Sequence, residues 1–174
     1  MTESEPIVLP DGTRLVVDPL SPEDRDELRE GIEHLSPDSR YRRFFTPVTH
    51  VSTQQLTYLT TLDHVQHEAL AAVDPDTGRG VAVARYVLVS DTPDTAEVAL
   101  AVLDEWQGRG VGRALLRRLA ALARRRGIVR FTGLMLTGNG AMISLMRSLG
   151  RVISTRRESG TVEVVVELDP DPVS

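Results

Sequence analysis

Apolar and polar positions alternate from Thr13 to Asp18, which is the period of a β-strand with one buried face. Later apolar segments bounded by turn residues also predict strands. They span His67–Val73, Val81–Ser90, Thr95–Leu103, Val129–Leu136, Arg151–Arg157 and Thr161–Leu168. Turn sequences lie at Pro75–Gly78 and Asp91–Asp94. We therefore expect antiparallel hairpins around both turns.

Helix signals fill the intervals between these strands. Ser21-Pro22-Glu23-Asp24 offers a capping serine, a first-turn proline and two acids, which predicts a helix to about Glu33. Ser36-Pro37-Asp38 repeats the signal for a short helix through Phe44. Three further helices are expected, over Thr53–Thr60, Gly110–Arg126 and Gly140–Leu149. The order of elements predicts an α/β domain whose mixed sheet has both hairpin and crossover connections.

A length of 174 residues suits one domain, and we expect it to span residues 13–169. Residues 1–12, with Met1–Pro6 loose, and the tail 170–174 are expected to flank it. No run approaches the roughly 18 apolar residues of a membrane span, and the acidic N-terminus has no signal region. We therefore expect a cytoplasmic protein without membrane contact. The absence of cysteine excludes disulfides and thiol nucleophiles.

The charge distribution is uneven. All 20 basic residues are arginine, so neither a lysine Schiff base nor a Walker-type lysine can operate here. Twelve of these arginines and a single acid lie between Glu105 and Arg157, although the whole chain carries a net charge of −5. Such a local positive field suits an anionic ligand. Nucleic acid is disfavoured by the acidic total, by 4% aromatic residues and by the lack of a recognised binding motif.

The segment Trp106–Arg113 is glycine-rich and lies between a predicted strand and a predicted helix. Glycines permit a tight turn and close approach of a ligand, and the first turn of a helix offers unpaired N–H groups that bind pyrophosphate. A dinucleotide motif would need a third glycine where Arg113 stands, and a P-loop would need lysine. The pattern Gln-x-x-Gly-x-Gly is matched by Gln107, Gly110 and Gly112.

With this turn, the segment Ala96–Gly150 resembles the core of the GCN5-related N-acetyltransferase (GNAT) superfamily. A strand, Asn139 and a short helix over Ala141–Leu149 match the second motif of that family. Leu35–Phe45 and Leu62-Asp63-His64 are similar to bacterial protein-lysine acetyltransferase domains. The resemblance implies a GNAT fold, a single domain with a mostly antiparallel sheet flanked by helices. Relatives often carry an additional regulatory domain, and none is expected here.

The resemblance also implies acetyl transfer from acetyl-CoA to an amine, with a protein lysine as the favoured acceptor. A small-molecule amine acceptor and a non-catalytic acyl-CoA-binding module are the alternatives. The turn would hold the pyrophosphate, the edge of the preceding strand would pair with pantetheine, and the asparagine would also contact the cofactor. The implied cofactor-binding residues are Ala101, Val102, Leu103, Gln107, Gly108, Arg109, Gly110, Val111, Gly112, Arg113 and Asn139.

Glu97 is the candidate general base, because it lies in an otherwise apolar strand and matches the catalytic glutamate of the similar protein acetyltransferases. Burial there would strengthen a carboxylate as a base. The alternative interpretation is a glutamate on the exposed face of that strand, and Glu68 is the reserve candidate. Many family members place a tyrosine after Asn139 to protonate the leaving thiolate. This helix has none, so the thiolate leaves unaided or with help from Ser144 or water.

Other features have simpler interpretations. His64 and His67 are three residues apart without a further ligand nearby, so no metal site is expected. Tyr41, Phe44 and Phe45 lie at helical spacing and are interpreted as core residues. Homodimerisation through the C-terminal strands is compatible with the family resemblance.

Overall fold

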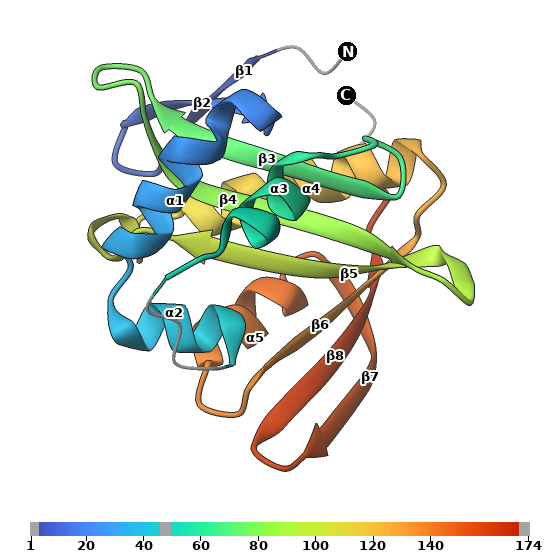
Figure 1. Ribbon diagram of the computed structural model, residues 1–174. Coiled ribbons are helices and arrows are strands. Elements are labelled where there is room, and N and C mark those ends of the chain that lie inside the picture. The colour runs from blue at the N-terminus through green and yellow to red at the C-terminus, as the bar shows by residue number, and fades with distance from the viewer. Residues whose placement is uncertain (1–3, 46–49, 171–174) are drawn as a thin grey trace.

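The computed structural model describes residues 4–45 and 50–170, and its centre is one eight-stranded sheet of order β1-β2-β3-β4-β5-β6-β8-β7 (Figure 1). Every neighbouring pair is antiparallel except β5 and β6, which are parallel. This confirms the mixed, mostly antiparallel sheet. The strands are β1 (Glu5–Val8), β2 (Arg14–Pro19), β3 (His67–Asp74), β4 (Arg79–Val89), β5 (Thr92–Val102), β6 (Arg130–Leu136), β7 (Gly150–Glu158) and β8 (Thr161–Leu168).

Helices cover both faces of the sheet. Those on one face come before β3 in the chain, and those on the other follow β5 (Figure 1). The first face carries α1 (Arg25–His34), α2 (Pro37–Phe44) and α3 (Thr53–Thr60), and the second carries α4 (Val111–Arg125) and α5 (Gly140–Arg147). The expected apolar stripe of α4 is buried in the main core at Leu115, Leu119 and Leu122. A smaller cluster joins α1 to α3 around Ile32 and Leu56.

Local chemistry explains where the helices begin, with one correction. The side chains of Ser36 and Ser52 accept hydrogen bonds from the third backbone N–H of α2 and α3. The expected helix start at Ser21 is instead a single 3-10 turn, η1 (Pro22–Asp24), which precedes α1. There Asp24 accepts a hydrogen bond of 2.8 Å from the backbone N–H of Ser21.

The structure contains one strand that was not expected and lengthens another. Glu5 and Pro6, expected to be loose, belong to β1 and lie opposite Val17 and Val16 of β2. The short antiparallel ladder and the burial of Ile7 hold this segment in place. At the second turn, the residues 92–94 extend β5, because the connection from β4 takes only two residues. Residues 1–3 and 171–174 of the expected loose ends lie outside the described residues.

The position of the site follows from the separation of β5 and β6. Their parallel pairing covers only three residues of each strand and ends where Glu97 lies opposite Thr132. Beyond this point β6 pairs only with β8, while β5 continues beside β4. The amide of Leu103 donates to Val81 on the β4 side, so alternate residues of β5 direct their backbone groups the other way. The backbone groups of Val98 and Leu100 therefore face the gap.

Candidate functional site

A groove of about 380 Å³ opens where β5 leaves β6. Its walls come from α2, β5, the glycine-rich turn with the start of α4, the end of β6, and α5. Ten of the twelve predicted site residues line it: Glu97, Ala101, Val102, Gln107, Gly108, Gly110, Val111, Gly112, Arg113 and Asn139. The structure thus brings together residues from three separate segments of the sequence.

The glycine-rich turn has the backbone that its sequence predicts. Gly108 and Gly110 adopt φ angles of 73° and 91°, a region that residues with a Cβ rarely enter. Gly110 is the N-cap of α4 and provides no side chain to bond the first amides of the helix. The first turn of α4 contains no acidic residue, and Arg113 lies within it. The helix start is therefore an uncapped, positively polarised end that opens into the groove.

Close packing against β5 explains why position 112 is a glycine. A Cβ on Gly112 would lie 2.9 Å from Cδ2 of Leu100. The helix start consequently approaches β5 more closely than any larger residue would allow.

Gln107 holds two walls of the groove together. Its Nε2 donates to the carbonyl oxygen of Val102 at 3.0 Å and to Oγ of Ser39 at 3.1 Å. The first bond uses the carbonyl of Val102 that would otherwise face the gap, and the second fixes α2 against the turn. The glutamine of the turn pattern therefore has a structural role in this chain.

Two predicted cofactor residues do not line the groove. Arg109 donates to Asp11 at 3.0 Å and to Thr13 at 2.9 Å, and its guanidinium lies 4.2 Å over the ring of Trp106. Hydrogen bonds from Thr13, then from Arg109, lower the pKa of Asp11 to about 2. Leu103 is buried and follows the end of β5, and its amide is used by β4. The Arg109 side chain is therefore engaged outside the groove, and the Leu103 amide is engaged by β4.

Asn139 lies between β6 and α5 and lines the groove. It is the N-cap of α5, where Oδ1 accepts a hydrogen bond of 3.3 Å from the amide of Met142. Among residues 4–45 and 50–170, no group accepts a hydrogen bond from its side-chain amide nitrogen, which is therefore available as a donor.

Glu97 lines the groove but is exposed, so the expected burial of this side chain is wrong. The alternation along β5 turns Ala96 and Val98 into the core beneath α4 and turns Glu97 toward the face that carries α2. Arg43 of α2 is its electrostatic neighbour: burial lowers the pKa of Arg43, and the attraction of Glu97 opposes that decrease. The gap between the diverging strands β5 and β6 is called the fork below, and the carboxylate of Glu97 lies at its vertex beside a cation.

A buried polar cluster lies on the same face of the sheet. Arg85 donates to the carbonyl of Leu59 at 3.1 Å and lies 3.0 Å from Nε2 of His67. Burial, with the repulsion of Arg43, lowers the pKa of Arg85 to about 9. Burial and the charge of Arg85 also lower the pKa of His67. The imidazole is therefore held neutral, with Nε2 as an acceptor.

The two histidines noted in the sequence point to different partners. His64 bonds through Nδ1 to Glu68 at 2.9 Å, whereas His67 meets Arg85. Across residues 4–45 and 50–170, no group of three or more histidine or acidic side chains is arranged to hold a metal ion.

Glu68, the reserve candidate base, is fully buried. It lies opposite Tyr86 in the ladder, on the α4 face, and forms an ion pair of 2.9 Å with Arg126. It also accepts hydrogen bonds from His64 and from the amide of Ala69 at 3.0 Å. Glu68 does not line the groove, and its contacts indicate a structural role.

The sequence interpretation missed the contribution of α2. Ser39, Arg42 and Arg43 of α2 line the groove together with Phe45, which follows the helix. The spacing of three and four residues from Ser39 to the two arginines would have indicated one helix face. The core interpretation holds for Phe44, which packs against the smaller cluster. It is wrong for Tyr41, which is exposed, and Phe45 lines the groove and belongs to neither core cluster.

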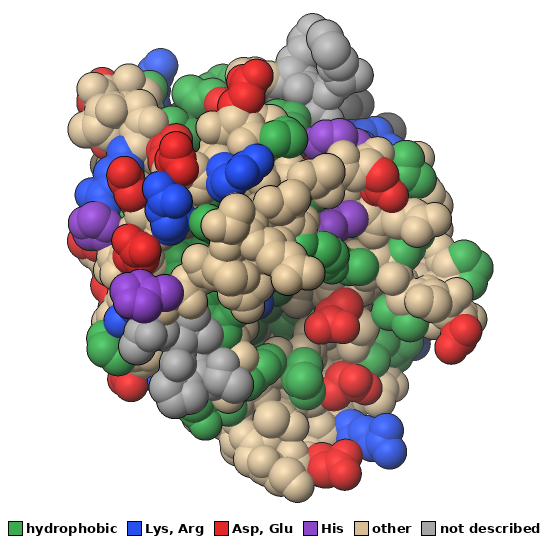
Figure 2. Space-filling model, viewed as in Figure 1, with side chains coloured by type: hydrophobic (Ala, Val, Ile, Leu, Met, Phe, Trp, Pro, Cys, Tyr) green, Lys and Arg blue, Asp and Glu red, His purple; other side chains and the backbone are tan. Residues whose placement is uncertain are grey.

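The outer surface of the α1 and α3 side carries charged side chains of both signs (Figure 2). Acidic and basic side chains are interspersed over this face (Figure 2). Within the described part of the chain, no helix combines the length and apolar character needed to cross a membrane.

Comparisons with known proteins agree with this geometry. The model of the Acetyltransferase (GNAT) family matches residues 31–150. Acetyltransferase Pat of Mycolicibacterium smegmatis is 32% identical over 165 residues, which cover 95% of this chain and 49% of that protein. The chain thus spans about half the length of that relative. Acetyltransferase PA5475 of Pseudomonas aeruginosa is 33% identical over 146 residues, covering 83% of this chain and 78% of that protein.

Among solved structures, the GNAT domain of S. lividans PAT superposes with a TM-score of 0.86 at 36% identity, covering 95% of this chain and 97% of that one. The sequence match, the fold and the open fork beside the glycine-rich turn lead to one conclusion: the chain belongs to the acetyltransferase (GNAT) family.

Proposed function

We propose that the protein transfers an acetyl group from acetyl-CoA to a primary amine, with a protein lysine as the favoured acceptor. One observation carries the proposal: the fork between β5 and β6 opens directly beside the uncapped start of α4. A fork supplies unpaired strand amides, and a helix start supplies an anion site. Acetyl-CoA carries both a peptide-like arm and a pyrophosphate, so its chemistry fits the two features together.

The groove offers a place for each part of the cofactor. The amides of residues 110–113 would hold the pyrophosphate, with the Arg113 guanidinium as an additional donor. The backbone groups of Val98 and Leu100 that face the gap between β5 and β6 would pair with the pantetheine arm, as an added strand does. This differs from the expectation for Ala101 and Leu103, because the amide of Leu103 already bonds Val81 and that of Ala101 has the same direction.

Glu97 would act as the general base. A lysine-type amine has a pKa of about 10.4, so its deprotonation at pH 7 costs roughly 4–5 kcal/mol. The free amine attacks the thioester carbonyl. A backbone amide of β5 that faces the gap donates a hydrogen bond to the carbonyl oxygen as this oxygen gains charge. Glu97 is exposed at the vertex of the fork, and this position suits a long acceptor side chain that approaches from the α2 side. The leaving thiolate has no tyrosine to protonate it, but Ser144 lines the groove.

The acceptor assignment rests on the similarity of the segment Leu35–Phe45, which contains α2, to bacterial protein-lysine acetyltransferase domains. That helix forms the wall next to Glu97, so it is the element that an incoming protein chain would contact. CoA thioesters and cellular proteins meet in the cytoplasm, where we place the reaction.

Isothermal titration with acetyl-CoA tests the first step, with NADH as the competing dinucleotide. Gly110→Glu places a carboxylate at the helix start, and Ser90→Glu adds the same charge to the distant β4–β5 turn as the control. We expect acetyl-CoA binding to the wild type and to Ser90→Glu, with its loss in Gly110→Glu. Preferential binding of NADH, or equal binding by the two variants, would contradict the proposal.

Mass spectrometry of a lysine-containing peptide library and of a small-amine panel, each incubated with acetyl-CoA and the protein, tests the acceptor. Acetyl-lysine in the peptides supports the favoured acceptor. Products from the small amines alone would replace it, and binding without any product would indicate a non-catalytic acyl-CoA-binding module.

A further inference from the structure

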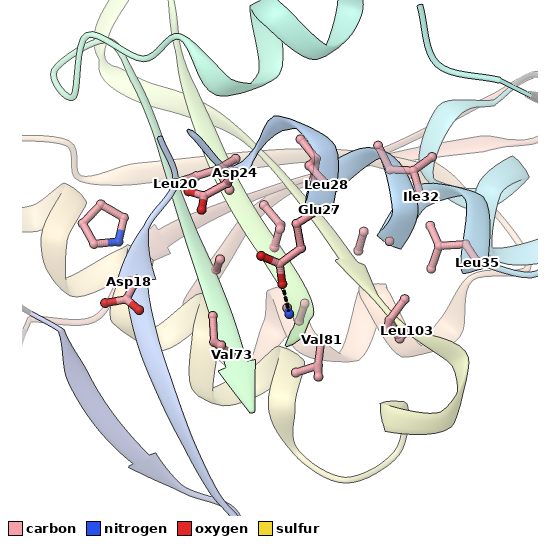
Figure 3. Close-up of a pocket in the computed structure, with 17 residues that line it drawn as sticks. Asp18, Leu20, Asp24, Glu27, Leu28, Ile32, Leu35, Val73, Val81 and Leu103 are labelled. Atoms are coloured by element: carbon pink, nitrogen blue, oxygen red, sulfur yellow. Dashed lines mark hydrogen bonds between the residues drawn. The ribbon is translucent and has the colours of Figure 1, made fainter. Parts of the chain in front are cut away.

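A second hollow of about 110 Å³ lies between α1 and the sheet (Figure 3). Three residues on adjacent strands form its floor: Ala71 of β3, Val83 of β4 and Ala101 of β5 lie in one register row. Asp18 of β2 continues the same row beyond Ala71. We call this hollow the α1 chamber. Its floor is apolar, and the carboxylate of Asp18 lies at one end of that floor.

The roof of the α1 chamber comes from α1 and leaves the space unfilled. Gly31 lies within this helix, where glycine is less favourable than alanine by roughly 0.5–1 kcal/mol. A Cβ added there would meet no heavy atom within 4 Å. The three floor residues keep part of their surface exposed even though the helix lies over them. The sequence thus maintains an opening at a position where an ordinary helix residue would begin to close it.

The charged residues that line the α1 chamber are all acidic. Its lining contains the carboxylates of Asp18, Asp24 and Glu27 and no arginine or histidine. Glu27 points down from α1 and accepts a hydrogen bond from the amide of Gly80 (Figure 3). The nearby cation Arg29 is occupied by Asp26 at 2.9 Å and is not part of the lining. A ligand with a positive head and an apolar body complements this arrangement.

We propose that the α1 chamber binds a small organic monocation, a primary ammonium group on an unbranched apolar body of about four or five carbon atoms. A dry cavity of about 150 Å³ holds a benzene ring, so a slightly shorter apolar body suits this volume. The ammonium would lie between Asp18 and Glu27, with the body over Ala71 and Ala101. The site is distinct from the acceptor position because Glu97 does not line it.

The α1 chamber adjoins the groove, since Leu35 and Ala101 line both hollows. Binding itself requires neither acetyl-CoA nor acetyl transfer. Failure of this proposal is therefore distinguishable from failure of the proposed function.

The test is a titration of the protein with n-pentylamine in the absence of acetyl-CoA, followed by calorimetry and by methyl NMR. We expect a Kd of about 1 mM or tighter, which is attainable for a six-atom ligand. The methyl signals of Ala71 and Val83, which line the α1 chamber and not the groove, should shift. Neutral 1-pentanol and anionic pentanoate should bind about tenfold more weakly or not at all. Binding that does not distinguish the three compounds, or shifts confined to residues of the groove, would overturn the proposal.

Pentylamine binding by variants of the lining residues tests whether the ligand lies in the α1 chamber. Gly31→Leu fills the α1 chamber and should abolish pentylamine binding, and Ala71→Val serves the same purpose if the first variant fails to fold. Glu27→Gln keeps an acceptor for the Gly80 amide but removes one charge, and should weaken binding about tenfold. Glu30→Gln makes the same change on the exposed side of α1 and should bind like the wild type. Wild-type affinity in both filled variants would overturn the proposal.

Discussion

Glu97 of β5 lies opposite Thr132 of β6, and this is the last parallel pair before the two strands separate. The candidate base is therefore placed at the vertex of the fork, with the unpaired backbone of Val98 and Leu100 beginning next to it. A carboxylate at this point is adjacent to any thioester whose arm follows β5. Under the proposed mechanism, the end of the ladder would set the distance between the Glu97 carboxylate and the reacting carbonyl.

Gly110→Ala should impair both stability and cofactor binding. With a φ of 91° and a Cβ placed 3.0 Å from Cδ of Pro10, alanine at this position is strained. We expect a decrease of about 1–2 kcal/mol in the free energy of unfolding and weaker binding of acetyl-CoA. Chemical denaturation and calorimetry measure the two effects. Gly31→Ala, in the regular helix α1, is the control and should be stabilised. A Gly110→Ala protein as stable as the wild type would refute the strain argument.

Gln107→Ala should loosen the groove. The variant loses two hydrogen bonds, to Val102 and to Ser39, each worth about 1 kcal/mol. Acetyl-CoA should bind several-fold more weakly, because α2 and β5 are no longer held together at the turn. Ser39→Ala retains the bond to Val102 and should show a smaller effect in the same titration. Equal affinities for Gln107→Ala and the wild type would show that this link does not shape the groove.

The Glu68–Arg126 pair should matter for stability and not for catalysis. Arg126→Met leaves a fully buried carboxylate without its cation, and the free energy of unfolding should fall by about 3 kcal/mol. Arg125→Met, at an exposed neighbouring position, should change it by less than about 0.5 kcal/mol. Turnover per folded molecule should stay near the wild-type value in Glu68→Gln. A large loss of turnover in that variant would restore Glu68 as a candidate base.

Asp11 should make stability depend on pH in the acidic range. Its pKa falls from 3.8 to about 2 on folding, so the unfolded chain binds the proton more readily. The stabilisation is complete above the unfolded pKa and is lost as the pH falls from about 4 toward about 2. The difference in unfolding free energy between the wild type and Asp11→Asn should shrink over this interval. A difference that is constant with pH would contradict the assigned contacts of Asp11.

Patterning predicted most of the fold because the relevant signals are local. The Ser36-Pro37 helix start and the Pro75–Gly78 hairpin each depend on a few neighbouring residues, and both are found. The strand β1 was missed because its stability depends on pairing with β2 and on the burial of Ile7, which only the tertiary structure provides. The extension of β5 to Thr92 is likewise set by its partner β4.

The sequence predicted the part of the candidate site whose backbone conformation requires glycine. Gly108 and Gly110 have the positive φ angles that the motif implies. The sequence did not reveal the direction of side chains: Glu97 is exposed, and Arg109 is occupied by Asp11. Both outcomes depend on contacts between segments far apart in the chain, which spacing alone does not encode.

The rate of acetyl transfer by Glu97→Gln tests the central claim most directly. The substitution keeps the size of the side chain and removes its ability to accept the proton, so turnover at neutral pH should fall by about 10²–10⁴-fold. Calorimetry should show unchanged acetyl-CoA binding, because Glu97 lies at the far end of the fork from the helix start. The control Glu105→Gln, on the exposed turn after β5, should retain turnover. Full activity in Glu97→Gln would contradict the assignment of Glu97 as the general base.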